Sequence, residues 1–77
     1  MKVKIISNNN IEVDSTNYIY LQSYDSLVCR LTKKDGLLIV NKKVANYSKT
    51  TKKHFNQFLD RHDIKKIVYT NKILKIE

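Results

Sequence analysis

Residues 27–40 read LVCRLTKKDGLLIV, and this stretch decides the fold class. In residues 27–32 an apolar side chain stands at every second position, which is the period of a strand. A Lys-Lys-Asp turn follows and ends in Gly36, the one glycine of the chain, where a hairpin most needs a positive φ. The apolar run of residues 37–40 comes next, and we expect it to be a central strand buried on both faces.

Three more strands are expected upstream of this stretch. Residues 2–5 and 11–14 alternate apolar and charged side chains, so we expect the apolar side of each to be buried and the charged side to face water. Three asparagines at positions 8–10 suit a hairpin turn between them. Residues 18–22 are aromatic and β-branched, and turn-forming residues at positions 23–26 end that strand.

Downstream the pattern changes to that of a helix. Ser48 can cap its N-terminus, and the segment to about His62 has helical periodicity. One side of this helix would lie on the sheet, and the opposite side would face water. The first side consists of Thr51, Phe55, Phe58, Leu59 and His62, and the second of Lys49, Lys53, Asn56 and Asp60.

The last segment, residues 66–76, leaves three alternatives open: one strand, a hairpin turned at Asn71 and Lys72, or a short helix. Together the segments predict an α+β fold, a small mainly antiparallel β-sheet with one amphipathic helix packed on it. A chain of 77 residues and 9.1 kDa can build one small core, so we expect residues 1–77 to form a single compact domain.

The composition also predicts a compartment. No stretch approaches the roughly 20 apolar residues that a membrane-spanning helix needs, and the N-terminal MKVKIIS runs into asparagines without a signal-peptide core. Cys29 is the only cysteine, and its apolar neighbours indicate a buried thiol rather than a reactive one. We therefore expect no membrane contact and a reducing compartment, the cytoplasm.

Positive charge is concentrated in the second half of the chain. The formal net charge is +8. Residues 1–38 carry five basic and four acidic side chains, whereas residues 39–77 carry ten and three. Such a surface attracts polyanions, because a lysine that meets a phosphate releases condensed counterions. The alternative, given equal weight, is that these lysines are only solvated surface.

Ten residues are candidates for contact with a partner or a nucleic acid. Lysines would meet phosphates, a tyrosine would stack on an unpaired base, and an asparagine would donate to a base edge or a phosphate. Lysine outnumbers arginine, the usual bidentate reader of guanine, so we expect contact with the backbone rather than sequence readout. The candidates are Lys42, Lys43, Tyr47, Lys49, Lys52, Lys53, Asn56, Arg61, Lys65 and Lys66.

The sequence offers little chemistry. His54 and His62 stand eight residues apart, roughly 12 Å along a helix, so they cannot share one metal ion. We expect His62 to pack near the helix end, where an imidazolium favours the helix dipole. A single glycine excludes a glycine-rich phosphate loop, and Cys29 has no base near it in sequence. The chain is therefore expected not to be an enzyme, with no catalytic residue, no metal site and no cofactor.

A pattern of Tyr-Ser, two hydroxyl residues, His, Asn and Phe-Leu lies in the second half of the chain. It is carried by Tyr47, Ser48, Thr50, Thr51, His54, Asn56, Phe58 and Leu59. With this pattern, the segment from residue 22 to residue 59 resembles small uncharacterised proteins of phages and mobile elements in low-GC Gram-positive bacteria. The resemblance covers about half of the chain and carries no known activity. The resemblance implies a gene carried by a phage or mobile element, and a protein that acts in the cytoplasm of a bacterial host cell. Such short proteins commonly bind host or defence machinery, including as inhibitors of RNA-guided nucleases.

These observations lead to one hypothesis and two alternatives. We expect a small phage or mobile-element accessory protein that acts by binding, as a stoichiometric, anti-CRISPR-like inhibitor of a host or bacterial defence nucleoprotein. It would be a monomer or a small homo-oligomer. The first alternative is a direct nucleic-acid-binding protein or transcriptional regulator that uses its Lys-rich surface. The second is a self-associating assembly module whose sheet edge pairs with itself or a partner, with residues 37–40 as the edge at risk.

Overall fold

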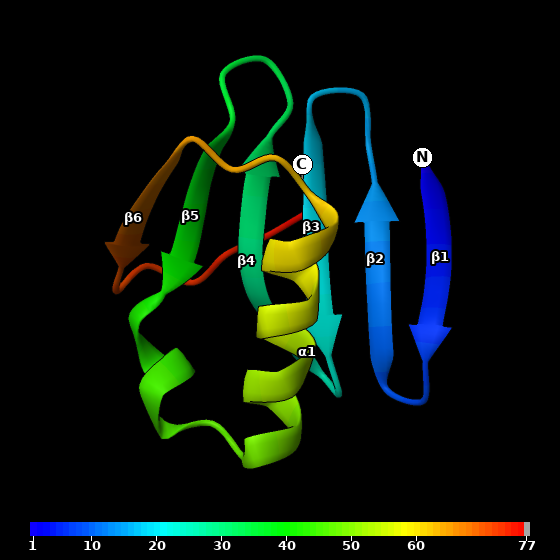
Figure 1. Cartoon of the computed structure of the whole chain (residues 1–77), viewed down its shortest axis with the longest axis vertical. Coiled ribbons are helices and arrows are strands. Elements are labelled where there is room, and N and C mark those ends of the chain that lie inside the picture. Colours follow the sequence, from blue (N-terminus) through cyan, green and yellow to red (C-terminus); the bar gives the residue numbers. More distant parts are fainter. Residues whose placement is uncertain (77) are drawn as a thin grey trace.

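The computed structural model describes residues 1–76, apart from the side chains of residues 44 and 45, so the last residue of the expected domain, residue 77, lies outside the described part. Within it, six strands form one sheet whose spatial order is the order of the chain (Figure 1). The strands are β1 (Lys2–Ser7), β2 (Asn10–Asp14), β3 (Tyr18–Ser23), β4 (Ser26–Thr32), β5 (Leu37–Asn41) and β6 (Lys66–Thr70). The helical elements are the 3-10 helix η1 (Lys42–Asn46) and the α-helix α1 (Lys49–Arg61). The α+β class is therefore confirmed.

The connections explain where the helix lies. Strands β1 to β5 pair antiparallel with their neighbours through short turns. Strand β6 instead pairs parallel with β5, and a parallel pair needs a long crossover. The segment from η1 to α1 supplies that crossover and lays α1 across the middle of the sheet (Figure 1). We call the side of the sheet under α1 the helix face and the opposite side the tail face.

The hydrophobic core lies between the helix face and α1. It comprises Leu21, Val28, Cys29, Leu31, Leu38, Val40 and Phe58. Strand β4 supplies two successive members because a bulge opposite Leu21 and Gln22 inserts an extra residue, which turns Val28 and Cys29 toward the same side. The expected burial of the Cys29 thiol is confirmed, and that burial raises the pKa of the thiol and keeps it neutral.

Two local predictions are confirmed at the ends of elements. The Ser48 side chain accepts a hydrogen bond from the Thr51 backbone N–H at 3.2 Å and so caps α1, which ends one residue before His62. Gly36 has a φ of +71°, and its carbonyl accepts from the Lys65 N–H at 2.9 Å. A Cβ at this position would stand 2.8 Å from Lys65 Cγ, so glycine lets the chain entering β6 approach the β4–β5 turn.

The expectation for residues 37–40 is wrong. Strand β5 lies next to the edge strand β6, and the central pair is β3 and β4. Leu38 and Val40 are buried on the helix face, whereas Leu37 and Ile39 are only partly buried on the tail face. A continuous apolar run predicts that both faces of the strand are covered. Here only the single stretch of chain formed by residues 71–76 covers the second face, so the side chains there are partly buried.

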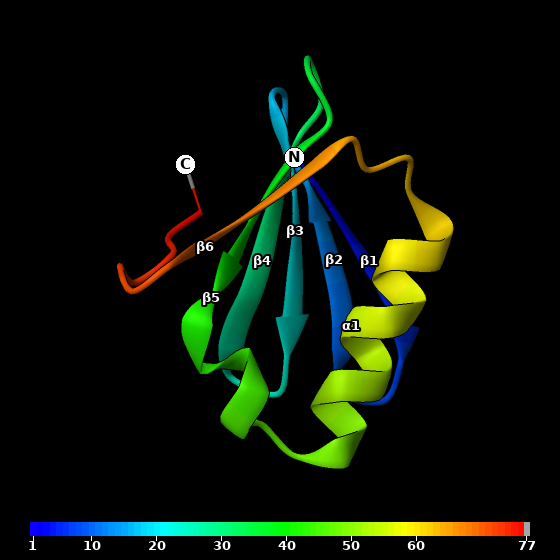
Figure 2. The same ribbon diagram turned by 60° about the vertical axis from the view of Figure 1, so that its left-hand side comes forward.

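The final segment combines a strand with an irregular end. Of the three alternatives for residues 66–76, the strand holds for Lys66–Thr70, and the hairpin and the helix are wrong. After a bend at residues 71 and 72, the chain crosses the tail face, so the sheet lies between this tail and α1 (Figure 2). The tail residues 72–75 line a groove together with Arg30 and Ile39 of the sheet.

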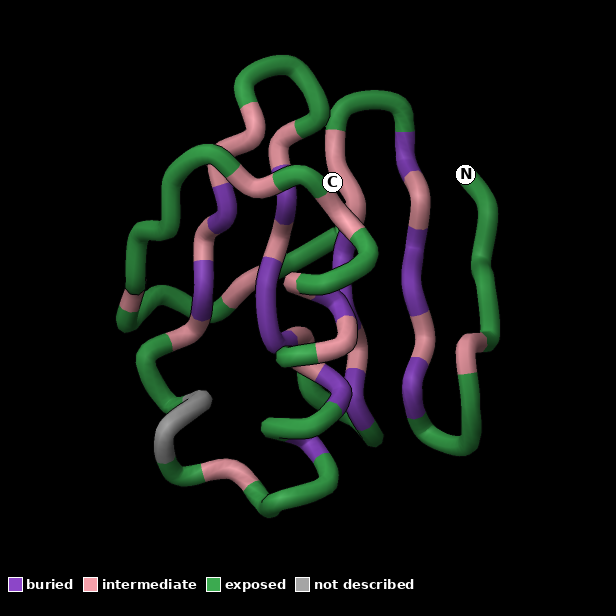
Figure 3. Tube along the Cα trace, viewed as in Figure 1, coloured by how far each residue is buried: buried purple, intermediate pink, exposed green. Residues whose placement is uncertain are grey.

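The first two strands reverse the expected faces in part. The apolar side chains of β1, Val3 and Ile5, are 64% and 75% exposed, and Glu12 of β2, expected in water, is only 5% exposed. The reason is that α1 covers the side of β2 that carries Asn10 and Glu12 and supplies polar partners to both. The burial pattern in Figure 3 shows this contrast, with β1 exposed along almost its whole length and β2 buried at most positions.

Candidate nucleic-acid interface

Five exposed lysines lie on the crossover, two on η1 and three on α1, and Lys43 also lines a groove with Asp25, Tyr47 and tail residues 73 and 74. We call Lys42, Lys43, Lys49, Lys52 and Lys53 the lysine face. Helix α1 buries Thr51, His54 and Phe58 against the sheet, so positions 49, 52, 53 and 56, spaced by three or four residues, point away from it. The predicted candidate Asn56 is exposed and continues the row along α1. Six of the ten predicted residues are therefore exposed on the segment formed by η1 and α1.

The lysine face lacks compensating acids. The sequence has no acidic residue between Asp35 and Asp60. The ion pairs among residues 1–76 involve other cations, namely Lys33, Arg61 and His62. The first turn of α1 carries no acidic side chain either, although a helix N-terminus favours one. Lysines and the positive end of the helix dipole thus act in the same direction, and the local field favours an anion.

The other four candidates lie elsewhere. Lys65 and Lys66 lead into β6, beyond the C-terminal end of α1, a helix of 13 residues and therefore roughly 20 Å long. The side chain of Lys65 lies against Gly36. Tyr47 packs partly against the core, so much of its ring is already covered. Arg61 is bound to a carboxylate of β2, as described next, and does not belong to the lysine face.

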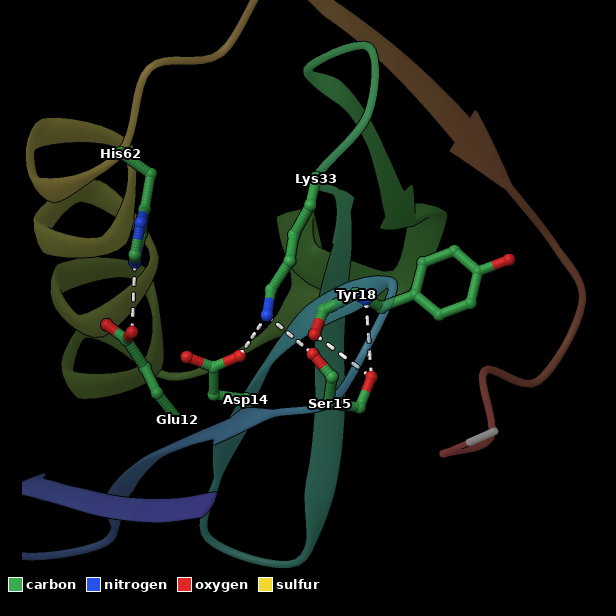
Figure 4. Close-up of polar contacts among 6 residues, drawn as sticks. All are labelled: Glu12, Asp14, Ser15, Tyr18, Lys33 and His62. Carbon is green, nitrogen blue, oxygen red and sulfur yellow. Dashed lines mark hydrogen bonds and ion pairs between the residues drawn. The ribbon is translucent and has the colours of Figure 1, made fainter. Parts of the chain in front are cut away.

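The buried carboxylate of Glu12, on β2, joins the sheet to the C-terminal end of α1. Glu12 Oε2 accepts from Arg61 Nε at 2.7 Å, and Glu12 Oε1 lies 2.9 Å from His62 Nε2 (Figure 4). The His62 ring also packs on Phe58, with 4.5 Å between the ring centroids. The Arg61 guanidinium therefore compensates the burial of this carboxylate, and the His62 ring nitrogen is a second polar partner. The expected position of His62 near the helix end is confirmed, but its partner is Glu12.

A second polar cluster lies about two helical turns closer to the start of α1. Ser23 Oγ stands 2.9 Å from Thr51 Oγ1 and 2.8 Å from His54 Nδ1. Burial, reinforced by the nearby Lys53 and Arg61, lowers the pKa of His54, so the ring is neutral and Nδ1 can accept the Ser23 hydroxyl proton. The distance matches that of a nucleophile and its general base, but Ser23 is only 1% exposed and shares its hydroxyl with Thr51. Because no substrate reaches this hydroxyl, the pair holds α1 on β3.

A further ion pair holds the two turns at one end of the sheet. The Lys33 ammonium binds the Asp14 carboxylate and the Ser15 backbone carbonyl, and the Ser15 hydroxyl in turn lies 3.0 Å from the Tyr18 carbonyl (Figure 4). The hydrogen bond from Lys33 lowers the pKa of Asp14. Lys33 therefore serves the fold, in contrast to the lysine face.

Comparison with known proteins places the chain in a family. A model of a family of unknown function, DUF8033, matches residues 1–75. The chain belongs to this family. No curated protein and no solved structure shows a significant match to it. Membership in DUF8033 assigns no activity, so the functional argument for this member of the family depends on its own residues.

Two further observations concern residues 1–76 of this DUF8033 protein. No group of three or more His, Cys, Asp or Glu side chains is placed to hold a metal ion. His54 and His62 contact different partners, Ser23 and Glu12. No helix of this part of the chain is long and apolar enough to cross a membrane.

Sequence reasoning missed the polar seam that fastens α1 to β2 and β3. The seam includes Asn10 Nδ2, which donates to Gln57 Oε1 at 3.3 Å, in addition to the clusters at Ser23 and Glu12. A signal for it exists in the helix, where Thr51, His54, Gln57 and Arg61 follow one another at steps of three or four residues. A polar stripe at helical spacing beside an apolar one indicates polar partners on the covered strands.

Proposed function

We propose that this protein acts without catalysis, by binding the phosphate backbone of a nucleic acid in a nucleoprotein through its lysine face. The observation that carries the proposal is the lysine face itself, five exposed lysines on η1 and α1 without an acidic partner among residues 1–76. Like charges held this close repel one another, and an arriving polyanion relieves that repulsion while it releases counterions.

The character of these residues favours backbone contact over base readout. Lysine is a point charge on a flexible stem, suited to phosphates, whereas specific recognition of guanine is usually made by the arginine fork. Arg61, the arginine of α1, is bound to Glu12 and is not available as a reader of bases. We therefore propose affinity that depends on salt and only weakly on sequence.

The biological role that we propose is inhibition. The small phage and mobile-element proteins that this chain resembles commonly act on host or defence machinery. We propose that this protein is such an accessory protein, a stoichiometric, anti-CRISPR-like inhibitor that acts in the bacterial cytoplasm and occupies part of a nucleoprotein that would otherwise hold nucleic acid. A basic face on a chain of 77 residues suits occupancy of an acidic groove or contact with exposed nucleic acid.

A second candidate function is direct nucleic-acid binding without a protein partner, as in a regulator of gene expression. The same lysine face favours it, because α1 presents Lys49, Lys52 and Lys53 on a single exposed side that can lie along a groove and contact its phosphates.

Retention of nucleic acid as a function of salt tests the proposal. Purified protein is expected to retain single- or double-stranded nucleic acid at low salt. The logarithm of its affinity should fall linearly with the logarithm of the salt concentration. The triple variant Lys49→Glu, Lys52→Glu, Lys53→Glu should lose this retention, and each contacting lysine should account for roughly 0.9 units of the salt slope on duplex DNA. No retention by the natural protein at low salt would contradict direct phosphate contact.

A matched control separates the lysine face from net charge. The triple variant Lys2→Glu, Lys4→Glu, Lys34→Glu changes the charge by the same amount at exposed positions away from η1 and α1. It should keep the salt slope of the natural protein. Equal losses in the two triple variants would mean that only the overall charge matters.

Affinity capture from a bacterial host lysate, with and without nuclease treatment, separates the two candidate functions. An inhibitor should recover the same protein partner in stoichiometric amount, and the lysine-face variant should not. A direct nucleic-acid-binding protein should recover partners only through intact nucleic acid, so nuclease treatment would release them all.

A further inference from the structure

Strand β1 is an open edge of the sheet. It pairs with β2 on one side, and among residues 1–76 no strand pairs with its other side (Figure 1). An edge strand directs the N–H and C=O groups of every second residue outward, where another extended chain can pair with them. Natural proteins commonly shorten, cover, bend or charge such edges. Strand β1 is uncovered, with six residues of which five are exposed, and the charges it carries are those of Lys2 and Lys4.

The two sides of β1 carry different chemistry. Val3 and Ile5 lie on the tail face, and Lys2 and Lys4 lie on the helix face, where their register partners are Asp14 and Glu12. Both acids already have partners, Lys33 and Arg61. The strand therefore offers one apolar side and one side with two cations.

The tail leaves the apolar side of β1 uncovered. Its residues 72–75 line a groove with Arg30 of β4 and Ile39 of β5, and in Figure 1 the tail passes behind these strands and does not reach β1. Val13 of β2 is 4% exposed, whereas Val3, its register partner on β1, is 64% exposed. The covered surface thus stops between β2 and β1, and a further strand beside β1 would extend it.

Pairing with a second copy of this chain is disfavoured by charge. In an antiparallel pair of two β1 strands, the registers centred on Val3 or on Lys4 keep Val3 and Ile5 on a common side and set a lysine across from a lysine, because side chains alternate with period two. The register centred on Ile5 avoids this contact but runs into the irregularity between Ile5 and Ser7. Like charges directly opposite one another destabilise a strand pair. The same alternation favours a partner strand with acidic side chains opposite Lys2 and Lys4.

From this geometry we infer that β1 is a docking edge for an extended segment of a partner protein, one that alternates acidic and apolar side chains. Its backbone adds a seventh strand to the sheet, its acidic side chains meet Lys2 and Lys4, and its apolar side chains pack beside Val3 and Ile5. This surface lies apart from the lysine face and does not depend on the proposed contact with nucleic acid.

The probe for this inference is a synthetic peptide of the length of β1 that alternates glutamate and valine. Binding is measured by fluorescence anisotropy, and the site is located by NMR through amide shifts and hydrogen exchange. The peptide is expected to bind, to slow the exchange of alternate amides of β1, and to leave the amides of η1 and α1 unchanged. No binding, or changes centred on the lysine face, would overturn the inference.

Two variants and one control peptide test the chemistry. The double variant Lys2→Glu, Lys4→Glu should bind the peptide roughly tenfold more weakly, because two attractive cross-strand pairs become repulsive, and should now bind a lysine–valine peptide. The double variant Lys52→Glu, Lys53→Glu is the matched control and should keep the affinity of the natural protein. Equal binding of both peptides by the natural protein would contradict the inference.

Self-pairing gives a distinct result. If the free protein dimerises with concentration-dependent changes at β1, the edge serves a second copy, and the inference of a partner protein is overturned. The double variant Val3→Thr, Ile5→Thr keeps strand-forming residues at exposed positions and is expected to fold, so weaker peptide binding by it reports the lost apolar contact. Unchanged binding by this variant would contradict the proposed packing of apolar side chains beside Val3 and Ile5.

Discussion

Two groups of basic residues in this protein differ in their partners. Arg61 and Lys33 are bound by Glu12 and Asp14, so they hold one part of the chain on another. The lysine face has no such acid among residues 1–76. The difference teaches that charge density along a sequence does not distinguish a binding surface from a structural contact. The acid that neutralises Arg61 lies 49 residues away, on the second strand of the sheet.

The largest effect is expected when the structural region loses its anion. In Glu12→Gln, Arg61 loses the carboxylate that compensates it, while the shape of the side chain is kept. The free energy of unfolding should fall by about 2 kcal/mol, less than for a fully buried pair because the Arg61 side chain is partly exposed. Chemical denaturation of the natural protein and of Glu12→Gln measures this difference in the free energy of unfolding.

The lysine face supplies the control for this substitution. Lys52→Gln removes one charge at an exposed position and should change the free energy of unfolding by less than about 0.5 kcal/mol. If Glu12→Gln lost as little stability as Lys52→Gln, the two regions would not differ in the way proposed.

A smaller loss is expected on acidification, through His54. Because the pKa of His54 is lowered in the folded protein, the unfolded chain binds more protons just below pH 6.5, the ordinary value for histidine. Stability from this group is complete above that pH and is lost as the pH falls through the folded pKa. Denaturation from pH 8 to pH 5 should therefore show a decline that is shallower in His54→Gln.

The smallest effect concerns the lysine face and has the opposite sign. Lys49→Glu with Lys52→Glu replaces cations by anions in the first turn of α1, where the helix dipole favours negative charge. We expect a gain of about 0.5 kcal/mol per substitution in the free energy of unfolding, together with weaker nucleic-acid retention. Lys34→Glu, in a turn outside the helix, is the control and should leave both quantities nearly unchanged. Loss of stability in the helix variant would indicate that these lysines support the fold.

Local signals in the sequence predict most of the elements. Ser48 caps the helix through a bond to a residue three positions away, and Gly36 takes the positive φ that its turn requires. Both features depend on chemistry within a few residues, so a single sequence is enough to predict them. The exposed lysines of α1 follow in the same way from helical spacing.

Long-range contacts were not predictable from the same patterns. Alternation in β2 reveals a strand but not which side the helix covers, and both Glu12 and Val13 are buried. The burial of Glu12 requires Arg61 to arrive from the end of the crossover. The placement of β6 beside β5, and of the tail beneath the sheet, likewise follows from how distant segments meet, which no local period encodes.

The order of the strands also has a consequence for folding. Strands β1 to β5 pair only with neighbours along the chain, so each hairpin closes a short loop at a small cost in entropy. The parallel pair of β5 and β6 instead encloses η1 and α1 and must close the longest loop in the sheet. From this topology we expect the meander to assemble early and the closure of the crossover to limit the folding rate.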